Sequence, residues 1–223
     1  MRPPDECRWG FPPPDEWPAD DDVVAVGADL DPDTLLWAYA HGMFPMRLGG
    51  RHPRLGWWSP VRRGIIPLES LRISRSLAQS TRKFEFTVNA AFSDVMEACA
   101  SDRTDGNWID DDFLAAYLKL HRLGSAHSIE VWDAEGRLAG GLYGVRIGGF
   151  FAGESMFHRV RDTSKVALVR LVELMRLDGM GLLDTQWCTP HLASLGCIEV
   201  TRGEYLRRLA AALADPRQQS PGQ

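Results

Sequence analysis

The sequence has few cysteines, no long hydrophobic run and no phosphate-binding glycine motif, and each absence excludes a class of protein. Four cysteines in 223 residues are too few and too scattered for a secreted disulfide framework, so we expect reduced thiols. Uncharged apolar runs such as residues 23–28 are far shorter than the roughly 20 residues of a membrane span. The first 17 residues are acidic and proline-rich, with no apolar segment typical of a secretory signal. We therefore expect a cytoplasmic protein with no membrane association.

The glycine-rich and cysteine-containing segments also lack the context of a nucleotide or metal site. No Walker-type GxxxxGK[ST] motif occurs, and GGLYG and GGFFAG lie in hairpin-like segments without a following helix. Cys188, His191 and Cys197 have no fourth ligand at a usual zinc spacing. A nucleophile pair of Cys188 and His191 would need a third group to orient it. The sequence therefore predicts no metal site and no cofactor, and His191 is expected to position substrate or cap a helix.

The net charge of −5 is distributed unevenly along the chain. Residues 1–61 contain ten Asp and Glu against five Lys and Arg, a net −5, whereas residues 62–223 contain twenty of each. Within the second part, residues 62–83 carry six basic side chains against one acidic side chain, a net +5. This cluster could bind a polyanion or simply face solvent, and charge alone does not decide. The change in composition predicts a domain boundary near residue 61.

Hydrophobic periodicity predicts a small, turn-rich N-terminal domain over residues 1–61 and a larger domain over residues 62–223. A helix is predicted to begin at the Asp31-Pro-Asp-Thr34 segment and to end at Gly42. In the larger domain we predict helices at 70–80, 90–100, 110–123, 163–177, 189–195 and 204–214, and strands at 83–89, 126–132, 138–145, 150–155, 181–187 and 197–201. The three central strands form an antiparallel meander, so this order predicts an α+β fold with one parallel crossover and a polar tail from about 215.

Two acidic residues stand in otherwise apolar strands. Asp184 and Gln186 are two positions apart in one predicted strand, so their side chains leave the same face. Glu154 closes the apolar segment 150–157 in the same way. A buried and unpaired carboxylate costs several kcal/mol, so Asp184 needs either a structural partner or a chemical task, and strand position does not choose between them. Together the two acids indicate a cleft that receives an amine or a cation.

Many sequence blocks occur in the order typical of one family. The blocks are VGADLDPDTLLWAYAHGMFP, WWSP, SLRISRS, CASDR, WID, LGSAHSIEVW, GGLYGV, FAGESMF, SKVAL, LLDTQ and HLASLG. Through them the chain resembles the bacterial leucyl/phenylalanyl-tRNA–protein transferases over nearly its whole length. The resemblance implies transfer of Leu, Phe or Met from aminoacyl-tRNA to the α-amine of proteins that begin with Arg or Lys, which marks them for N-end rule degradation. It also implies a C-terminal domain of acetyltransferase-like (GNAT) fold, with the N-terminal domain covering the site.

The resemblance also implies roles for single residues. Asp184 and Gln186 match the reaction centre, where Asp184 is expected to hydrogen-bond the attacking amine, and Glu154 lies in the same cleft. Trp108 matches a family tryptophan at the terminal adenosine of the tRNA, whereas Met46 stands where the family commonly has tryptophan. Beside these, we expect an apolar donor pocket formed by Leu142, Phe151, Leu168 and Leu183, and tRNA phosphate contacts from Arg72, Arg75, Arg82 and Lys83.

Two other functions stay open on the sequence. An acyl-CoA-dependent N-acyltransferase of the same fold has a glycine-rich pyrophosphate loop before the helix at 163, but here residues 158–162 read HRVRD without glycine. A non-catalytic RNA-binding module that uses residues 62–83 would leave Asp184, Gln186 and Glu154 unexplained. Because an aminoacyl ester is already activated, a transferase needs mainly to hold ester and amine together and to handle one proton. We expect a monomer whose partners are aminoacyl-tRNA and proteins with N-terminal Arg or Lys.

Overall fold

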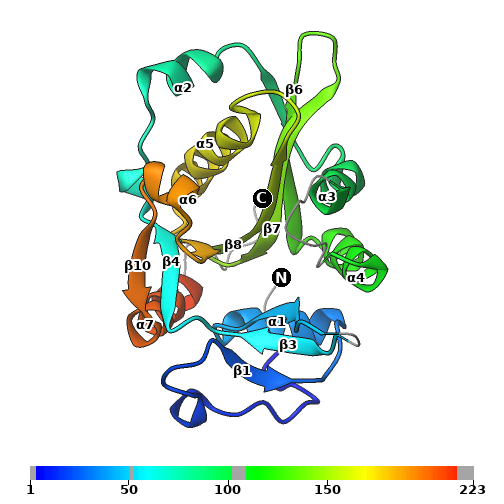
Figure 1. Cartoon of the computed structure of the whole chain (residues 1–223), viewed down its shortest axis with the longest axis vertical. Helices are drawn as coiled ribbons and strands as arrows, with labels where there is room; N and C mark the ends of the chain where they lie inside the picture. The colour runs from blue at the N-terminus through cyan, green and yellow to red at the C-terminus, as the bar shows by residue number, and fades with distance from the viewer. Residues whose placement is uncertain (1–3, 51–52, 102–108, 215–223) are drawn as a thin grey trace.

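The computed structural model describes residues 4–50, 53–101 and 109–214 and contains two β-sheets (Figure 1). A three-stranded sheet has the order β1-β3-β2, and a seven-stranded sheet has the order β10-β4-β9-β8-β7-β6-β5. The helices are η1 (Pro14–Glu16), α1 (Pro32–Ala40), η2 (Leu68–Ser70), α2 (Arg75–Ser80), α3 (Phe92–Ser101), α4 (Asp111–Arg122), α5 (Thr163–Leu177), α6 (Pro190–Ser194) and α7 (Arg202–Ala214). The strands are β1 (Val23–Val26), β2 (Phe44–Arg47), β3 (Leu55–Trp58), β4 (Arg62–Ile66), β5 (Glu85–Val88), β6 (Ala126–Trp132), β7 (Leu138–Ile147), β8 (Phe150–His158), β9 (Leu182–Gln186) and β10 (Ile198–Thr201). Across these described ranges, every helix is too short or too polar to cross a membrane.

The N-terminal sheet lies beside α1, whose position the sequence predicts. Asp31 precedes the helix in an extended conformation, Pro32 occupies its first turn, and Gly42 follows its end with a φ of +84°. The three strands are not predicted, because each has only four residues and two of them contain Pro45 or Gly56. Pro45 is tolerated because β2 is an edge strand.

The seven-stranded sheet contains the predicted meander and crossover. Strands β6, β7 and β8 pair antiparallel in succession, and α5 then leads to β9, which pairs in parallel with β8. The predicted α+β fold is confirmed, with a mixed sheet flanked by helices and the predicted order of meander, helix and parallel strand. The sequence does not predict β4, a five-residue strand that lies between β9 and β10 and pairs antiparallel with both.

One predicted helix is shorter than expected. The sequence predicts a helix over 70–80, but α2 begins at Arg75, where the Ser74 hydroxyl accepts a hydrogen bond from the N–H of Leu77 at 3.2 Å. Before this cap, the N–H of Arg72 donates to the carbonyl of Leu195 at 2.9 Å. This tertiary hydrogen bond holds the preceding residues out of the helix, so a long-range contact overrides local propensity.

Helices cover both faces of the large sheet. Helices α5 and α2 lie on one face, and α3 and α4 lie on the other (Figure 1). Helix α7 packs against β4, β8, β9 and β10. The core beneath α5 includes the four apolar residues that the sequence places in a donor pocket, namely Leu142, Phe151, Leu168 and Leu183. The parallel pair of β8 and β9 therefore runs through the middle of the molecule with α5 above it.

Candidate active site

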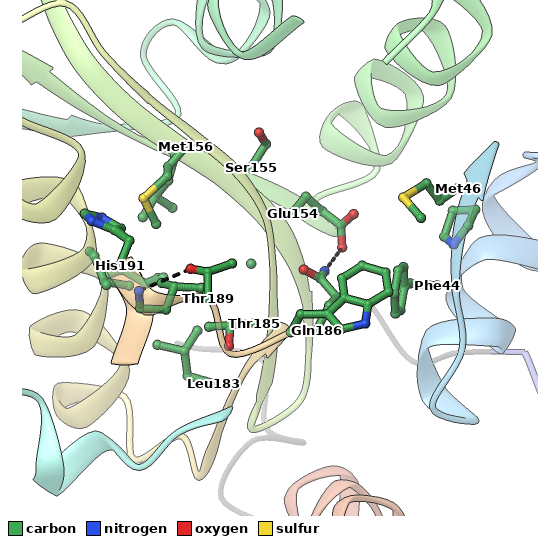
Figure 2. A pocket seen from close by; sticks show the side chains of 17 residues that line it. Phe44, Met46, Glu154, Ser155, Met156, Leu183, Thr185, Gln186, Thr189 and His191 are labelled. Carbon is green, nitrogen blue, oxygen red and sulfur yellow. Dashed lines mark hydrogen bonds between the residues drawn. The ribbon is translucent and has the colours of Figure 1, made fainter. Parts of the chain in front are cut away.

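The candidate site lies where β8 and β9 separate. The two strands pair only from Phe150 and Leu182 to Ala152 and Asp184. Beyond this point their ends diverge, and a pocket of about 340 Å³ opens between them (Figure 2). Such a volume lies within the range of small-ligand sites. The pocket is lined by Phe44, Pro45, Met46, Leu142, Gly153, Glu154, Ser155, Met156, Leu168, Leu171, Leu183, Thr185, Gln186, Trp187, Thr189, His191 and Leu192.

A β-bulge in β8 directs Glu154 into the pocket. The pairing with β7 passes from Tyr143 and Ser155 directly to Gly144 and Gly153, so Glu154 is the extra residue. A bulge leaves its extra residue unpaired in the ladder and bends the strand, which re-aims the side chain. The expected position of Glu154 at the end of an apolar strand therefore becomes a position on the pocket wall.

Neutral hydrogen-bond donors surround the Glu154 carboxyl group. Its side chain accepts hydrogen bonds from the Tyr117 hydroxyl at 3.3 Å and from the Gln186 amide nitrogen at 3.1 Å, and Tyr117 contacts the Tyr39 hydroxyl in turn. Glu154 is only 9% exposed. Burial is the largest influence on its pKa; hydrogen bonds from Tyr39 and Tyr117 lower the pKa and the nearby charge of Asp184 raises it, and together these effects raise the pKa of Glu154 to about 8. Glu154 is therefore mostly protonated at neutral pH.

A tight backbone turn sets the direction of Gln186. This residue has a φ of +58°, in the left-handed region, and the N–H of Trp187 donates to the carbonyl of Thr185 at 2.7 Å. The turn packs closely on β4, where a Cβ at Gly64 would lie 2.5 Å from the carbonyl carbon of Trp187. Only glycine fits at that position, so β4 and the turn together aim the Gln186 amide at Glu154 (Figure 2).

The carboxylate of Asp184 faces away from the pocket. It is fully buried and forms a two-pronged ion pair with Arg63, with Nε to Oδ1 at 2.8 Å and Nη2 to Oδ2 at 2.5 Å. The Tyr205 hydroxyl donates to Oδ2 at 2.9 Å, and the N–H of Gln186 donates to Oδ1 at 2.9 Å. The sequence-based expectation that Asp184 touches the amine is therefore corrected: its oxygens are occupied, and its link to the pocket runs through the backbone of Gln186.

Arg63 joins the seven-stranded sheet to the N-terminal region. Its guanidinium lies 4.8 Å from the ring centroid of Phe44 and 4.2 Å from that of Tyr205, and it donates to the Gly42 carbonyl at 3.2 Å. Burial opposes its charge, but Asp184 outweighs that effect and raises the pKa of Arg63 above its ordinary value. The sequence places Arg63 in a basic cluster that could bind a polyanion or face solvent, and it does not predict this ion pair. The available signal was the need of a buried Asp184 for a partner.

Most of the remaining predicted substrate residues meet at the pocket. Leu142, Leu168 and Leu183 form its apolar wall, and Met46 lies at the end near Glu154 while His191 lies at the opposite end (Figure 2). Phe151 does not line the pocket, because it is buried in the core beside it. Trp108 lies outside the described residues.

The four predicted tRNA-binding residues are all exposed. Arg72, Arg75, Arg82 and Lys83 form no ion pair with the described parts of the chain and lie in or beside α2. The basic cluster is smaller on the surface than in the sequence, because Arg63 is buried in its ion pair. Helix α2 packs against α5, one wall of the pocket, so the exposed basic residues lie on the same side of the sheet as the pocket (Figure 1).

Within the described ranges, no group of three or more His, Cys, Asp or Glu residues is placed to hold a metal ion. Cys188, His191 and Cys197 do not form such a group, and the pocket offers Glu154 as its sole lining carboxyl group among the described residues. The arrangement can supply hydrogen bonds and an apolar surface, the two requirements for positioning an activated ester.

Comparison with known proteins gives one consistent family. A model of the leucyl/phenylalanyl-tRNA protein transferase family matches residues 65–210, and a model of the N-terminal domain of the same family matches residues 28–61. A leucyl/phenylalanyl-tRNA–protein transferase of Pseudoalteromonas atlantica is 49% identical over 215 residues, covering 94% of this chain and 91% of that protein. A protein with the same description from Rhizorhabdus wittichii is 52% identical over 189 residues, covering 82% and 75%.

Proposed function

The chain belongs to the leucyl/phenylalanyl-tRNA–protein transferase family, and from that premise we propose that it transfers Leu, Phe or Met to the α-amine of proteins that begin with Arg or Lys. The transferase activity follows from the family. The donor side chains, the acceptor residues and a role in N-end rule degradation belong to the proposal. We also propose a monomer in the cytoplasm, where charged tRNA is available.

The observation that carries the proposal is a pocket with an apolar wall and uncharged polar groups at one end. Leu142, Leu168 and Leu183 can bury a linear or γ-branched aminoacyl side chain, at about 25 cal/mol for each Å² removed from water. A charged donor side chain would find no ion-pair partner on this wall. The ester would then lie toward Glu154 and Gln186, at the end of the pocket that carries the polar groups (Figure 2).

Gln186 is the group best placed to orient the attacking amine. Its amide nitrogen is occupied by Glu154, so its carbonyl oxygen is left to accept a hydrogen bond from the amine N–H. The amine nitrogen attacks the ester carbonyl carbon, the new C–N bond forms, and the bond to the ribose oxygen breaks. The proton lost by the amine passes to the ribose oxygen, which leaves as the terminal hydroxyl of the tRNA. An α-amine with a reference pKa of about 7.7–8.0 is already partly neutral near pH 7.5, so no strong base is required.

Asp184 serves this step as a positioning residue. It accepts the N–H of Gln186 at 2.9 Å while Arg63 holds it in place, so the left-handed turn at Gln186 is fixed from behind. A protonated Glu154 is suited to hold the Gln186 amide and a ribose hydroxyl by hydrogen bonds. Asp184 and Glu154 thus hold Gln186 from two sides, and neither places a fixed negative charge beside the ester.

The packing of the first turn of α5 argues against the rival acyl-CoA reaction, which needs a pyrophosphate site there. Thr163 is fully buried and donates to the Ala139 carbonyl at 2.8 Å, and Ser164 is 5% exposed. A Cβ at Gly140 would lie 2.2 Å from the Thr163 hydroxyl oxygen, so this turn packs directly on β7. Residues 158–161 of the loop before it are exposed, but the N–H groups of Arg159 and Val160 both donate to the Ala139 carbonyl and that of Thr163 donates to the Val160 carbonyl, so these donors are not free to cradle a pyrophosphate.

The deciding experiment combines purified protein, an Arg-initiated reporter peptide and tRNA charged with Leu, Phe, Met, Ile or Lys, with and without chelator. We expect transfer from the first three donors, little from Ile or Lys, and no effect of the chelator. Acyl-CoA in place of charged tRNA is the control for the rival reaction. No transfer from any aminoacyl-tRNA would refute the proposed function.

We further propose that the exposed cluster of Arg72, Arg75, Arg82 and Lys83 binds tRNA phosphates. Reversing two charges in the variant R75E/R82E should weaken tRNA binding and lower the slope of log affinity against log salt by roughly one unit for each lost contact. The matched control is Arg122→Glu, an exposed change on the opposite face of the sheet. Equal losses in the control and the double variant, measured by fluorescence anisotropy, would place tRNA elsewhere.

A further inference from the structure

Two free cysteines, Cys188 and Cys197, lie on either side of a short segment that forms one wall of the pocket. Cys188 comes two residues after β9 and Cys197 directly precedes β10, so the pair encloses α6. Thr189, His191 and Leu192 of the enclosed segment line the pocket (Figure 2). We propose that Cys188 and Cys197 are an oxidative modification site, which a peroxide converts to a disulfide that slows transfer. Formation of the bond is independent of the proposed function, whereas its effect on transfer rests on that function.

The fold brings the two thiols into contact. Sγ of Cys197 lies 3.4 Å from Oγ1 of Thr185, a residue of β9 that lines the pocket. The N–H of Cys197 donates to the Leu192 carbonyl at 3.0 Å, so the chain after α6 folds back on that segment. The Cys188 thiol is in hydrogen-bonding contact with the Cys197 thiol, and both residues pack in the same apolar cluster. A bond between the two sulfur atoms therefore joins groups that already touch.

The two thiols differ in exposure, which assigns their roles in oxidation. Cys188 is partly exposed and Cys197 is buried. Burial is the largest influence on the pKa of Cys197; the Thr185 hydroxyl lowers it and the Cys188 thiol raises it, and together these effects raise it to about 12. Cys197 therefore stays protonated at neutral pH. Because the thiolate is the reactive form of cysteine, oxidation begins at Cys188.

The reaction consumes one peroxide for each disulfide. The Cys188 sulfur attacks one peroxide oxygen, the O–O bond breaks, and Cys188 becomes a sulfenic acid while the other oxygen leaves as water with the thiol proton. The Cys197 sulfur then attacks the Cys188 sulfur, and the S–O bond breaks. The hydroxyl group leaves as a second water with the proton of Cys197. The two thiols lose two electrons, which the peroxide gains, and a dithiol reductant reverses the change by exchange.

The new bond affects the pocket through the backbone on both sides of it. It closes a loop of residues 188–197, whose ends it draws together, and this loop carries part of the pocket wall. On the other side, Cys188 follows Gln186 by two residues. A Cβ at Gly64 would lie 2.7 Å from the backbone nitrogen of Cys188, so the chain is tightly packed on β4 there. A shift of Cys188 must therefore be taken up by the neighbouring turn at Gln186.

The test measures the bond and the transfer rate separately. Trypsin cleaves after Arg176 and Arg202, and the peptide 177–202 contains both cysteines and no other. After peroxide treatment of the folded wild-type protein, we expect this peptide to be lighter by two hydrogen atoms and to resist alkylation until dithiothreitol is added. Transfer of Leu should fall by about tenfold or more, because a displacement of roughly 1 Å can cost about a hundredfold in rate. Dithiothreitol should restore the rate.

Variants assign the sensitivity to the pair. We expect Cys188→Ser and Cys197→Ala to keep their own transfer rates in peroxide. Cys7→Ser is the matched control, because Cys7 is also a partly exposed thiol, and this variant should stay as sensitive as wild type. An equal loss of rate in peroxide for Cys188→Ser would overturn the assignment and indicate another oxidised group, such as the pocket methionines Met46 and Met156.

Two further results would overturn the proposal. Absence of the disulfide from peptide 177–202 after peroxide treatment would show that the two cysteines are not an oxidation site. A disulfide formed without any change in transfer rate would show that the bond does not reach the pocket. If the reduced wild-type protein transferred from none of the aminoacyl-tRNAs, the proposed function would fail, and the mass of peptide 177–202 would still test the pair.

Discussion

Two buried carboxyl groups lie on opposite sides of β9, one behind the strand and one in front of it on the pocket side, and they differ in the charge of their hydrogen-bond partners. Behind the strand, Asp184 meets the charged guanidinium of Arg63 and the hydroxyl of Tyr205. In front of it, Glu154 meets only neutral donors, and burial raises its pKa to about 8. The difference lies in the partner, since a cation compensates a buried negative charge and a hydroxyl or amide does so only in part.

This contrast explains how the pocket is built. The ion pair behind β9 is fully desolvated, and Asp184 accepts the N–H of Gln186, so the pair supports the turn at Gln186 without lining the pocket. The neutral carboxyl group in front leaves the pocket without a fixed charge, which suits an apolar side chain and an ester. The ion pair and the neutral carboxyl group thus lie on opposite sides of one strand.

The largest expected effect comes from breaking the ion pair on its cationic side. Arg63→Ala leaves Asp184 buried without its partner, and we expect the free energy of unfolding to fall by about 3–5 kcal/mol. The matched control is Arg62→Ala on the same strand, whose exposed pair with Glu199 at 3.4 Å should contribute less than about 1 kcal/mol. Urea unfolding measures both. Similar losses in the two variants would mean that burial of the pair is not what distinguishes the region behind β9.

A smaller effect is expected from the contact that joins the two regions. Gly64→Ala forces the turn after Gln186 away from β4, so we expect a loss of about 1–3 kcal/mol and a fall in transfer rate. Gly181→Ala is the control, because a Cβ there meets nothing within 4 Å. Full transfer by the Gly64→Ala variant would show that the turn does not set the position of the Gln186 amide.

The smallest effect at a fixed pH is expected from Glu154→Gln. At pH 6 a neutral amide replaces a mostly neutral acid, so we expect stability to change by less than about 1 kcal/mol. The pH dependence should change more. Because the folded-state pKa of about 8 lies above the unfolded value, wild type binds more protons when folded and loses stability as the pH rises toward and through 8. Glu154→Gln should lack this loss, and urea unfolding from pH 5 to 9 would show it. A control at exposed Glu85, Glu85→Gln, should keep the wild-type dependence.

The sequence predicts the parts of this comparison that depend on local pattern. The meander and α5 follow from periodicity, and Asp184, Gln186 and Glu154 stand out as polar residues in apolar strands. The partner of Asp184 lies 121 residues earlier in the chain, in a short strand without alternation, so no local pattern predicts Arg63.

The bulge at Glu154 is equally hidden from the sequence. It appears only when β8 is placed against β7, because the extra residue is defined by the partner strand. The four-residue strands β1 to β3 also depend on their partners, since none is long enough to show a period. What the sequence leaves out is therefore the long-range pairing that decides whether a buried acid is charged.

The most direct test of the comparison is the protonation state of Glu154 in solution. Carbon-13 NMR of the side-chain carboxyl groups, with Glu154→Gln used to assign the signal, gives the pKa of this group in the folded protein. We predict a titration midpoint near 8, with the Glu154 signal in its protonated position at pH 6. A midpoint near the ordinary value of about 4.3 would contradict it, because both buried acids would then be charged and the division between the two sides of β9 would not exist.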